Sequence, residues 1–226
     1  MTKTNKTEAN AASFLRKHKS RILALVSVLA PLTLVLDVLV GSKALFNKDI
    51  QLSFYPLKTY LRDRLAQGDF PLWTPDLGLG MPFFALPEVG AVYPPNLILL
   101  LPWPACVGQL LVIHLALAAL GMYLLARDFK MRPEAAVFGA MVFSMSGYLL
   151  SMTSSSGIYA ISVSWMPLVV FLARRATSRA DARSIIYLGL AVACQALNGE
   201  YQGSILTALL ALALSGLPPA SLEACD

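Results

Sequence analysis

Residues 49–96 read DIQLSFYPLKTYLRDRLAQGDFPLWTPDLGLGMPFFALPEVGAVYPPN and separate two strongly apolar segments. The stretch is rich in proline, glycine and aromatic residues. Its acidic residues are Asp49, Asp63, Asp69, Asp76 and Glu88. Loops of this length without regular structure are usually functional or disordered, and this one has too many aromatic and leucine side chains for disorder. We therefore expect an ordered loop that carries the chemistry of the protein.

The composition of the whole chain indicates a membrane protein. Of its 226 residues, 57% are hydrophobic and 14% are charged, whereas soluble domains carry about a quarter charged residues. Because one membrane-spanning helix needs roughly 20 apolar residues, we predict an all-α polytopic membrane helix bundle of about six spans. The predicted spans are residues 22–39, 105–125, 135–152, 158–173, 185–197 and 204–217. Pro133, just before the third span, suits a first helical turn.

The lysine and arginine residues predict the orientation of these spans. Cytoplasmic loops carry an excess of them, and 13 of the 18 lie in three segments, 1–21, 127–132 and 174–183, on one side of the predicted bundle. Both termini are therefore expected in the cytoplasm, and the basic residues flank spans rather than bind nucleic acid. The first apolar run is too long for a signal peptide and lacks a cleavage site, so we expect an uncleaved span. The organisation is a cytoplasmic basic arm at 1–21, a membrane domain at 22–217 with an outer loop at 47–96, and an unassigned tail at 218–226.

The outer loop begins with a predicted amphipathic helix over residues 50–66. Apolar side chains recur at three- and four-residue spacing, with basic and acidic residues between them, which suits a helix lying on the membrane surface. Pro56 is expected near its true start. Beyond Gly68, turn residues recur every few positions, and we expect a compact cap that packs on this helix. Three aromatic side chains should make that contact: Trp73, Phe83 and Phe84.

Seven motifs follow one another along residues 48–216: DIQLSFYP, GDFPLWTPDLGLGMPF, VYPPNLILLL, HLALAALGMYLL, SGYLL, SWMPLVVFLARR and NGEYQ. In this order and spacing the chain resembles the YfhO-like bacterial membrane proteins, which belong with the polytopic glycosyltransferases of the GT-C type. The resemblance implies a multi-pass protein of the bacterial inner membrane that transfers a sugar from a polyprenyl-phosphate donor to a cell-envelope acceptor at the outer face. In that class the usual catalytic group is an acidic residue just after the first span. Asp49 occupies that position.

The chain departs from the family in two ways. Such enzymes carry about twice as many spans, so we expect an N-terminal part that works with a second chain supplying the missing C-terminal spans. Family members often have Gln where this chain has Glu88, and the role of the extra carboxylate stays open. The cofactor is unknown, and a divalent metal is possible because the departing phosphate needs positive charge.

Asp49 and Glu200 are the candidate catalytic residues. Sugar transfer needs a base that deprotonates the acceptor hydroxyl. The alternative for Asp49 is an N-cap of the following helix, and the alternative for Glu200 is a solvated hairpin turn. The candidate substrate-binding residues are Tyr55, Lys58, Arg62, Glu88, Tyr93 and Gln202. Two other functions remain open: a transporter or flippase for a lipid-linked substrate, and a fragment without catalytic activity.

Other polar residues in apolar segments have plainer interpretations. His114, in the second span, is expected to be packed and hydrogen-bonded. Asp37 lies near the outer end of the first span, close enough to the interface to stay hydrated. Cys106 and Cys194 are expected to pack as small residues, and nothing argues for a disulfide with either of them or with Cys225.

Overall fold

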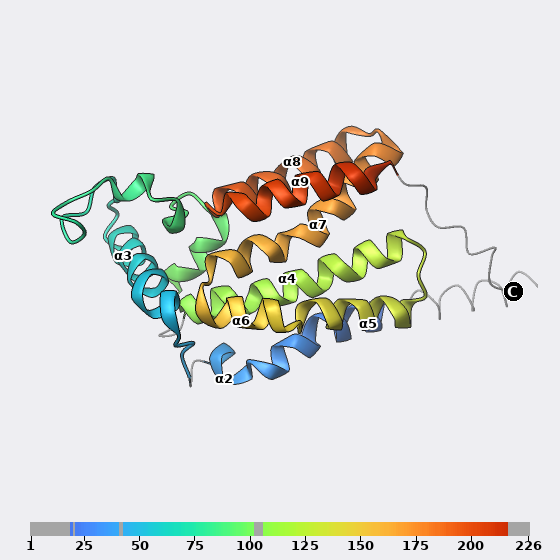
Figure 1. Ribbon diagram of the computed structural model, residues 1–226, viewed down its shortest axis with the longest axis horizontal. Helices are drawn as coiled ribbons and strands as arrows, with labels where there is room; N and C mark the ends of the chain where they lie inside the picture. The colour runs from blue at the N-terminus through green and yellow to red at the C-terminus, as the bar shows by residue number, and fades with distance from the viewer. Residues whose placement is uncertain (1–18, 20, 41–42, 102–105, 217–226) are drawn as a thin grey trace, which may run out of the picture.

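The computed structural model describes residues 19, 21–40, 43–101 and 106–216. The predicted arm, apart from Lys19 and Arg21, and the tail 218–226 lie outside the described residues. The described part is all-α, as predicted, with one isolated bridge between Thr74 and Met81 in place of any sheet. Its long helices lie roughly along one direction, and the outer loop covers one end of them (Figure 1).

Two long helices form the centre of the bundle. α4 (Cys106–Asp128) packs against α7 (Ile158–Arg179) and α5 (Pro133–Ser144), and α7 also packs against α8 (Ala182–Leu197) and α9 (Tyr201–Ser215). α4 has no proline in its interior, and the left-handed backbone at Lys130 (φ 60°) ends the run before Pro133. Pro133 lies in the first turn of α5, which confirms its predicted place.

Three helices are long and apolar enough to cross a membrane: Val107–Asp128, Pro133–Ser155 and Ile158–Arg179. Their length and composition indicate a multi-pass membrane protein, in agreement with the sequence. The other predicted spans form shorter apolar helices, Arg21–Leu34, Ala182–Leu197 and Tyr201–Ser215. The third predicted span is interrupted at Met145, because the side chain of Ser146 accepts a hydrogen bond from the Leu149 amide and starts α6 (Gly147–Ser155).

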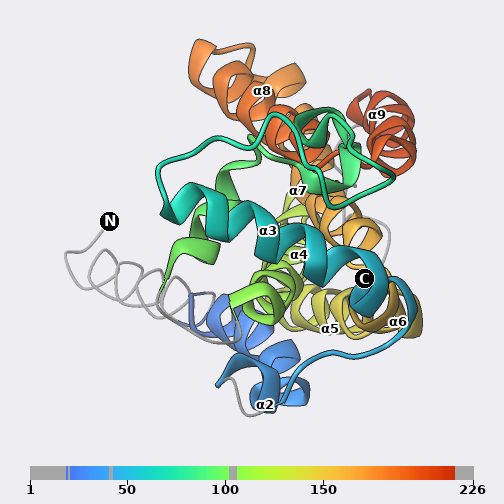
Figure 2. The same ribbon diagram turned by 90° about the vertical axis from the view of Figure 1, so that its left-hand side faces the viewer.

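The predicted helix over residues 50–66 exists, but it differs from an amphipathic surface helix. A π-helical turn, η1 (Ile50–Phe54), leads into α3 (Tyr55–Ala66), with Pro56 in the first turn of α3. The predicted apolar positions Phe54, Leu57 and Leu61 are buried. Lys58, expected among the solvated charges, is completely buried. Figure 2 shows α3 crossing the end of the bundle, with the loop that follows it alongside.

The cap beyond α3 consists of three 3₁₀ helices, η2 (Phe83–Ala85), η3 (Pro87–Val89) and η4 (Pro94–Leu100). Phe83 is buried with its ring 4.7 Å from that of Tyr60 on α3, as predicted. The prediction is wrong for Trp73 and Phe84, which are 55% and 46% exposed. These two rings fold back on the loop itself.

A chain of hydrogen bonds ties the cap to the bundle. The indole nitrogen of Trp165 on α7 donates to the Tyr93 hydroxyl over 2.7 Å, and that hydroxyl lies 2.5 Å from Nε2 of His114 on α4. Nδ1 of His114 lies 2.6 Å from the Leu110 oxygen. The Leu110 carbonyl oxygen can only accept a hydrogen bond, so this geometry places the imidazole proton on Nδ1. Nε2 of His114 then accepts from the Tyr93 hydroxyl. His114 is thus packed and hydrogen-bonded, as predicted.

Three further predictions concern Asp37 and the cysteines. Asp37 is exposed and pairs with Lys43, whose ammonium lies 2.6 Å from its carboxylate. Cys194 is a half-buried free cysteine. The side chain of Cys106 and all of Cys225 lie outside the described part of the chain.

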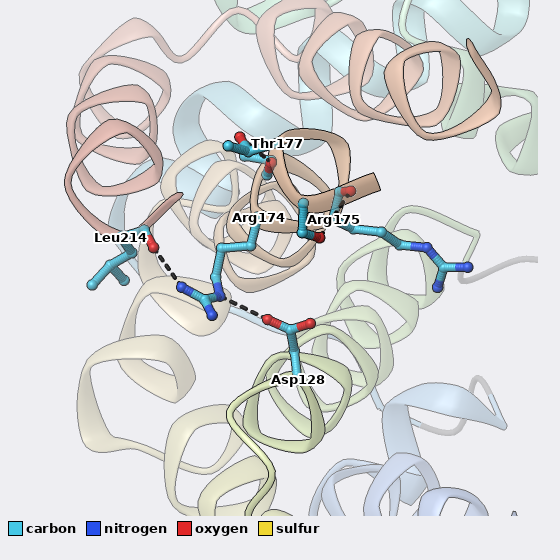
Figure 3. A network of polar contacts seen from close by, with 7 residues as sticks. Asp128, Arg174, Arg175, Thr177 and Leu214 are labelled. Carbon is cyan, nitrogen blue, oxygen red and sulfur yellow. Dashed lines mark hydrogen bonds and ion pairs between the residues drawn. The ribbon is translucent and has the colours of Figure 1, made fainter. Parts of the chain in front are cut away.

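At the end of the bundle away from the outer loop, Arg174 joins three helices (Figure 3). Its Nε donates to Asp128 at the end of α4 over 2.7 Å, and its Nη1 donates to the Leu214 oxygen near the end of α9. The guanidinium also lies 4.0 Å from the centre of the Phe129 ring. Only 5% of Arg174 is exposed, so this ion pair is largely shielded from water.

Candidate functional site

A pocket of about 950 Å³ lies where the outer loop meets the ends of the helices. Its walls come from three parts of the chain that are distant in sequence: η1 with the start of α3, the cap, and the turns that begin α7 and α9. The lining residues are Asp49, Leu52, Ser53, Phe54, Pro56, Leu57, Leu77, Gly78, Met81, Leu86, Pro87, Glu88, Ser156, Ile158, Tyr159, Gly199, Glu200, Tyr201 and Gln202.

The pocket brings together four of the predicted site residues and leaves four outside its lining. Both catalytic candidates, Asp49 and Glu200, line it, as do Glu88 and Gln202. The other substrate-binding candidates, Tyr55, Lys58, Arg62 and Tyr93, do not. Arg62 pairs with its neighbour Asp63 over 2.8 Å on the surface of α3.

Asp49 is exposed and precedes the π-helical turn at the N-cap position. Its side chain makes no capping hydrogen bond, so the N-cap alternative is wrong. The reason is local: Asp49 has helical backbone angles, φ −65° and ψ −25°, whereas a capping residue usually has an extended backbone. The carboxylate therefore remains available to a bound molecule.

Glu200 is 6% exposed and caps the N-terminus of α9. Its Oε1 accepts from the Gln202 amide over 2.8 Å and its Oε2 accepts from the Gly203 amide over 2.7 Å. The solvated-turn alternative is therefore wrong. Gly203 is required beside it, because a Cβ there would lie 2.6 Å from both Glu200 Oε2 and the Ser162 hydroxyl. The two bonds fix the carboxylate at the pocket wall.

Glu88 is exposed and projects from η3, which begins with Pro87. Its carboxylate accepts a hydrogen bond from Ser53 on η1 over 2.8 Å. This contact links the cap to the helical side of the pocket across its mouth.

The pocket depends on a close approach of two backbones. Gly199 has φ +88°, and a Cβ built on it would lie 1.7 Å from the Pro87 oxygen. Gly90 has φ +52°, and a Cβ built on it would lie 3.1 Å from the Leu197 oxygen. Only glycine allows both this backbone conformation and this contact. The cap and the turn between α8 and α9 therefore fit together through two glycines.

Lys58 and Tyr93 lie behind the cap rather than in the pocket. The Lys58 ammonium donates to the Val89 oxygen over 2.7 Å and to Asn96 Oδ1 over 3.2 Å. Burial disfavours the charged form and lowers the pKa of Lys58 to about 7. Burial also raises the pKa of Tyr93, partly offset by the hydrogen bond from Trp165. Both side chains hold the loop in place.

The charges of the lining decide which chemistry fits. Asp49, Glu88 and Glu200 are carboxylates, and the lining includes no lysine, arginine or histidine. Such a pocket suits hydroxyl groups, which donate to carboxylates, and offers a base. The described residues contain no group of three or more His, Cys, Asp or Glu side chains arranged to hold a metal ion.

Several lining residues were not among the sequence candidates. Ser53 holds Glu88, Ser156 follows the end of α6, and Tyr159 lies in the first turn of α7. The motif TSSSG at 153–157 falls at the same end as NGEYQ at 198–202 in the predicted topology. This shared placement could have indicated that the TSSSG segment lies near Glu200. It does not show which of the serines face the pocket.

Comparisons of the chain with models of protein families, with curated proteins and with solved structures find no match.

Proposed function

We propose that this chain is the N-terminal part of a GT-C-like membrane glycosyltransferase that transfers a sugar from a polyprenyl-phosphate donor to a cell-envelope acceptor. One observation supports this proposal most: Asp49, the predicted base, lines a large pocket together with Glu88 and Glu200. In the proposed reaction Asp49 removes the proton from the acceptor hydroxyl as the hydroxyl oxygen bonds to the sugar and the phosphate departs.

The three carboxylates have different roles in this proposal. Asp49 carries no capping bond, so its oxygens can accept the acceptor proton. Glu200 is held by two backbone amides and orients the acceptor rather than taking its proton. Glu88, bonded to Ser53, holds the mouth of the pocket.

The walls of the pocket support a lipid-linked substrate. Apolar side chains from three elements, including Leu52, Leu77 and Tyr159, line it beside the carboxylates. Leu52 is 77% exposed, which suits contact with an acyl or prenyl chain at the membrane surface. Because carboxylates repel phosphate, the acceptor hydroxyl occupies the pocket in this proposal, while the donor phosphate stays at its edge and the lipid chain of the donor contacts the exposed Leu52.

The decisive experiment measures transfer of a labelled sugar from a polyprenyl-phosphate donor in membranes containing this chain and any partner it needs. Asp49→Asn keeps the shape of the side chain and removes the base, so transfer should fall about a hundredfold or more. Thermal unfolding should not change, since the side chain caps nothing. Glu200→Gln should lose less activity, because its role is orientation.

Asp63→Asn is the matched control, because Asp63 pairs with Arg62 on α3 outside the pocket lining. It should transfer sugar at nearly the unmodified rate. Near-full activity of Asp49→Asn beside an active unmodified protein would contradict the proposal. Movement of the lipid-linked sugar across the membrane without transfer would favour a transporter instead.

We also propose six spans with both termini in the cytoplasm and the outer loop outside, in the bacterial inner membrane. The arginine-rich segments 127–132 and 174–183 lie at the opposite end of the bundle from the outer loop (Figure 1), which supports this orientation. Single cysteines at the exposed positions Asp76 and Ser178, in a background without native cysteines, test it with an impermeant thiol reagent. Labelling of intact cells at position 76 alone is expected, and labelling at 178 alone would invert the topology.

A further inference from the structure

Lys58 is a buried cation without a neighbouring carboxylate. Its side chain is 0% exposed, and its ammonium contacts two neutral oxygens, those of Val89 and Asn96, and the face of the Phe54 ring at 5.3 Å. Burial of a charge that no opposite charge balances is costly. The cost arises only while the segment from η3 to η4, residues 87–100, lies over α3.

This segment also forms one wall of the pocket. Pro87 meets Gly199, and Glu88 reaches Ser53, so both contacts depend on the segment staying on α3. Asn96 reinforces the arrangement, because its Nδ2 donates to the Gly90 oxygen over 2.7 Å. Moving the segment away would hydrate Lys58 and open the pocket together.

We propose that Lys58 makes this pocket wall sensitive to pH: the segment 87–100 is held on α3 more firmly above neutral pH and is released more readily in acid. The inference concerns the pocket itself and does not depend on which reaction occurs there.

The direction follows from where Lys58 binds its proton. In the docked state burial lowers its pKa to about 7, whereas a hydrated lysine has a pKa of about 10.4. Between these values the released state binds more protons than the docked state, so the docked state gains stability as pH rises. As pH falls through 7, docking becomes least favourable, because both states then carry the charge and the docked state must bury it.

The other ionisable groups around Lys58 have partners of their own. On η3, Glu88 faces Ser53, and on α4, His114 is bonded to Tyr93 and the Leu110 oxygen. On α3, Arg62 pairs with Asp63 and Arg64 pairs with Asp69, at the surface. Release would also break the Tyr93–His114 and Glu88–Ser53 bonds. Because these groups are present in both proteins, comparison with a variant that lacks only the Lys58 charge isolates the contribution of Lys58.

Hydrogen–deuterium exchange of the segment tests this inference without any activity assay. The amides of Gly90, Tyr93 and Asn96 bond within the segment, so their exchange reports its release. The measurement compares the unmodified protein with Lys58→Met from pH 6 to pH 9. Methionine has a similar length and cannot be charged, and the ratio of the two exchange rates at each pH cancels the intrinsic rate.

We expect the unmodified protein to gain protection relative to Lys58→Met by about tenfold or more between pH 7 and pH 9, and by less than about twofold between pH 6 and pH 7. Lys43→Met, at an exposed ion pair, is the control and should keep the profile of the unmodified protein. A ratio that stays flat or falls from pH 6 to pH 9 would overturn the inference. If Lys58→Met does not fold, protection of the unmodified protein corrected for intrinsic exchange gives the same decision.

Discussion

At one end of the bundle a buried cation is paired, and at the other it is not. Arg174 meets Asp128, the Leu214 oxygen and the Phe129 ring, so three helices share one satisfied charge (Figure 3). Lys58 at the pocket end meets two neutral oxygens and the Phe54 ring, while the three carboxylates of the described pocket lining have no lysine or arginine among them.

This difference indicates that the Arg174 end contributes mainly to stability and the pocket end mainly to binding. The Arg174–Asp128 pair stabilises the positions of the helices that it joins. At the pocket end, burial of Lys58 costs stability, and the exposed carboxylates of Asp49 and Glu88 provide groups that a substrate can satisfy. Substitutions at the two ends should therefore have different consequences, and the following experiments measure them.

Gly199→Ala should have the largest effect, because it separates the pocket walls. Its Cβ would lie 1.7 Å from the Pro87 oxygen, and alanine would also have to adopt φ +88°. Backbone strain and overpacking together should reduce the free energy of unfolding by about 3 kcal/mol or more, measured by denaturation in detergent.

Gly189→Ala on α8 is the matched control. No atom lies within 4 Å of a Cβ built there, and the residue is inside a helix. Replacing glycine with alanine should therefore stabilise the protein by up to about 1 kcal/mol. Equal stability of Gly199→Ala and the unmodified protein would show that the two walls do not touch.

Arg174→Met should destabilise the protein by about 2 kcal/mol, because it leaves Asp128 and the Leu214 oxygen without their donor. The loss is below that of a fully buried pair, since the Asp128 side chain is 27% exposed. The exposed Arg179 provides a control, Arg179→Met, which should unfold like the unmodified protein. The pocket should keep its ligands in both variants, and a loss of sugar transfer from folded Arg174→Met would break the proposed separation of the two ends.

Substitutions of the helix-capping residues at the two ends should change the free energy of unfolding least. Glu200→Gln has only one carbonyl oxygen for the Gln202 and Gly203 amides, so unfolding should cost about 1 kcal/mol less. Asp181 caps α8 at the Arg174 end, where its Oδ1 accepts from the Ser184 amide over 2.7 Å. Asp181→Asn should barely change stability at neutral pH, because asparagine is an equally good cap.

The Asp181 cap should also respond to acid. The backbone hydrogen bond from Ser184 lowers the pKa of Asp181 in the folded protein. Its contribution is therefore complete above the ordinary aspartate pKa of about 4 and is lost as pH falls through the lower folded value. Asp181→Asn should weaken the loss of stability in unfolding curves measured from about pH 5 downward. An unchanged pH dependence in the variant would show that another group is responsible.

Local patterns predicted the helices well because apolar length and turn chemistry act over a few residues. The stripe of Phe54, Leu57 and Leu61 and the first-turn place of Pro133 were both visible in the sequence. The break at Met145 was not predicted, because Ser146 can lie inside a helix as well as cap one. Its capping role depends on the backbone that the bundle imposes.

The pocket was harder to predict because it depends on contacts between distant residues. Asp49 was chosen because the family resemblance implies an acidic catalytic residue just after the first span. Glu200 was chosen from its position between two apolar segments, and both residues line the pocket. Lys58 was misplaced because a lysine between apolar positions normally marks the solvated face of a helix. Only the later residues Val89 and Asn96 explain its burial, and nothing near Gly199 in sequence indicates that it meets Pro87.

The contact between Pro87 and Gly199 has a consequence for how the protein is made. More than a hundred residues separate the two positions, and a ribosome adds about 5–20 residues per second. Synthesis of the turn that contains Gly199 therefore follows synthesis of the outer loop by roughly 5–20 s. During synthesis the outer loop cannot complete its pocket until the α8–α9 hairpin has been made, so folding of the loop is coupled to the arrival of that hairpin.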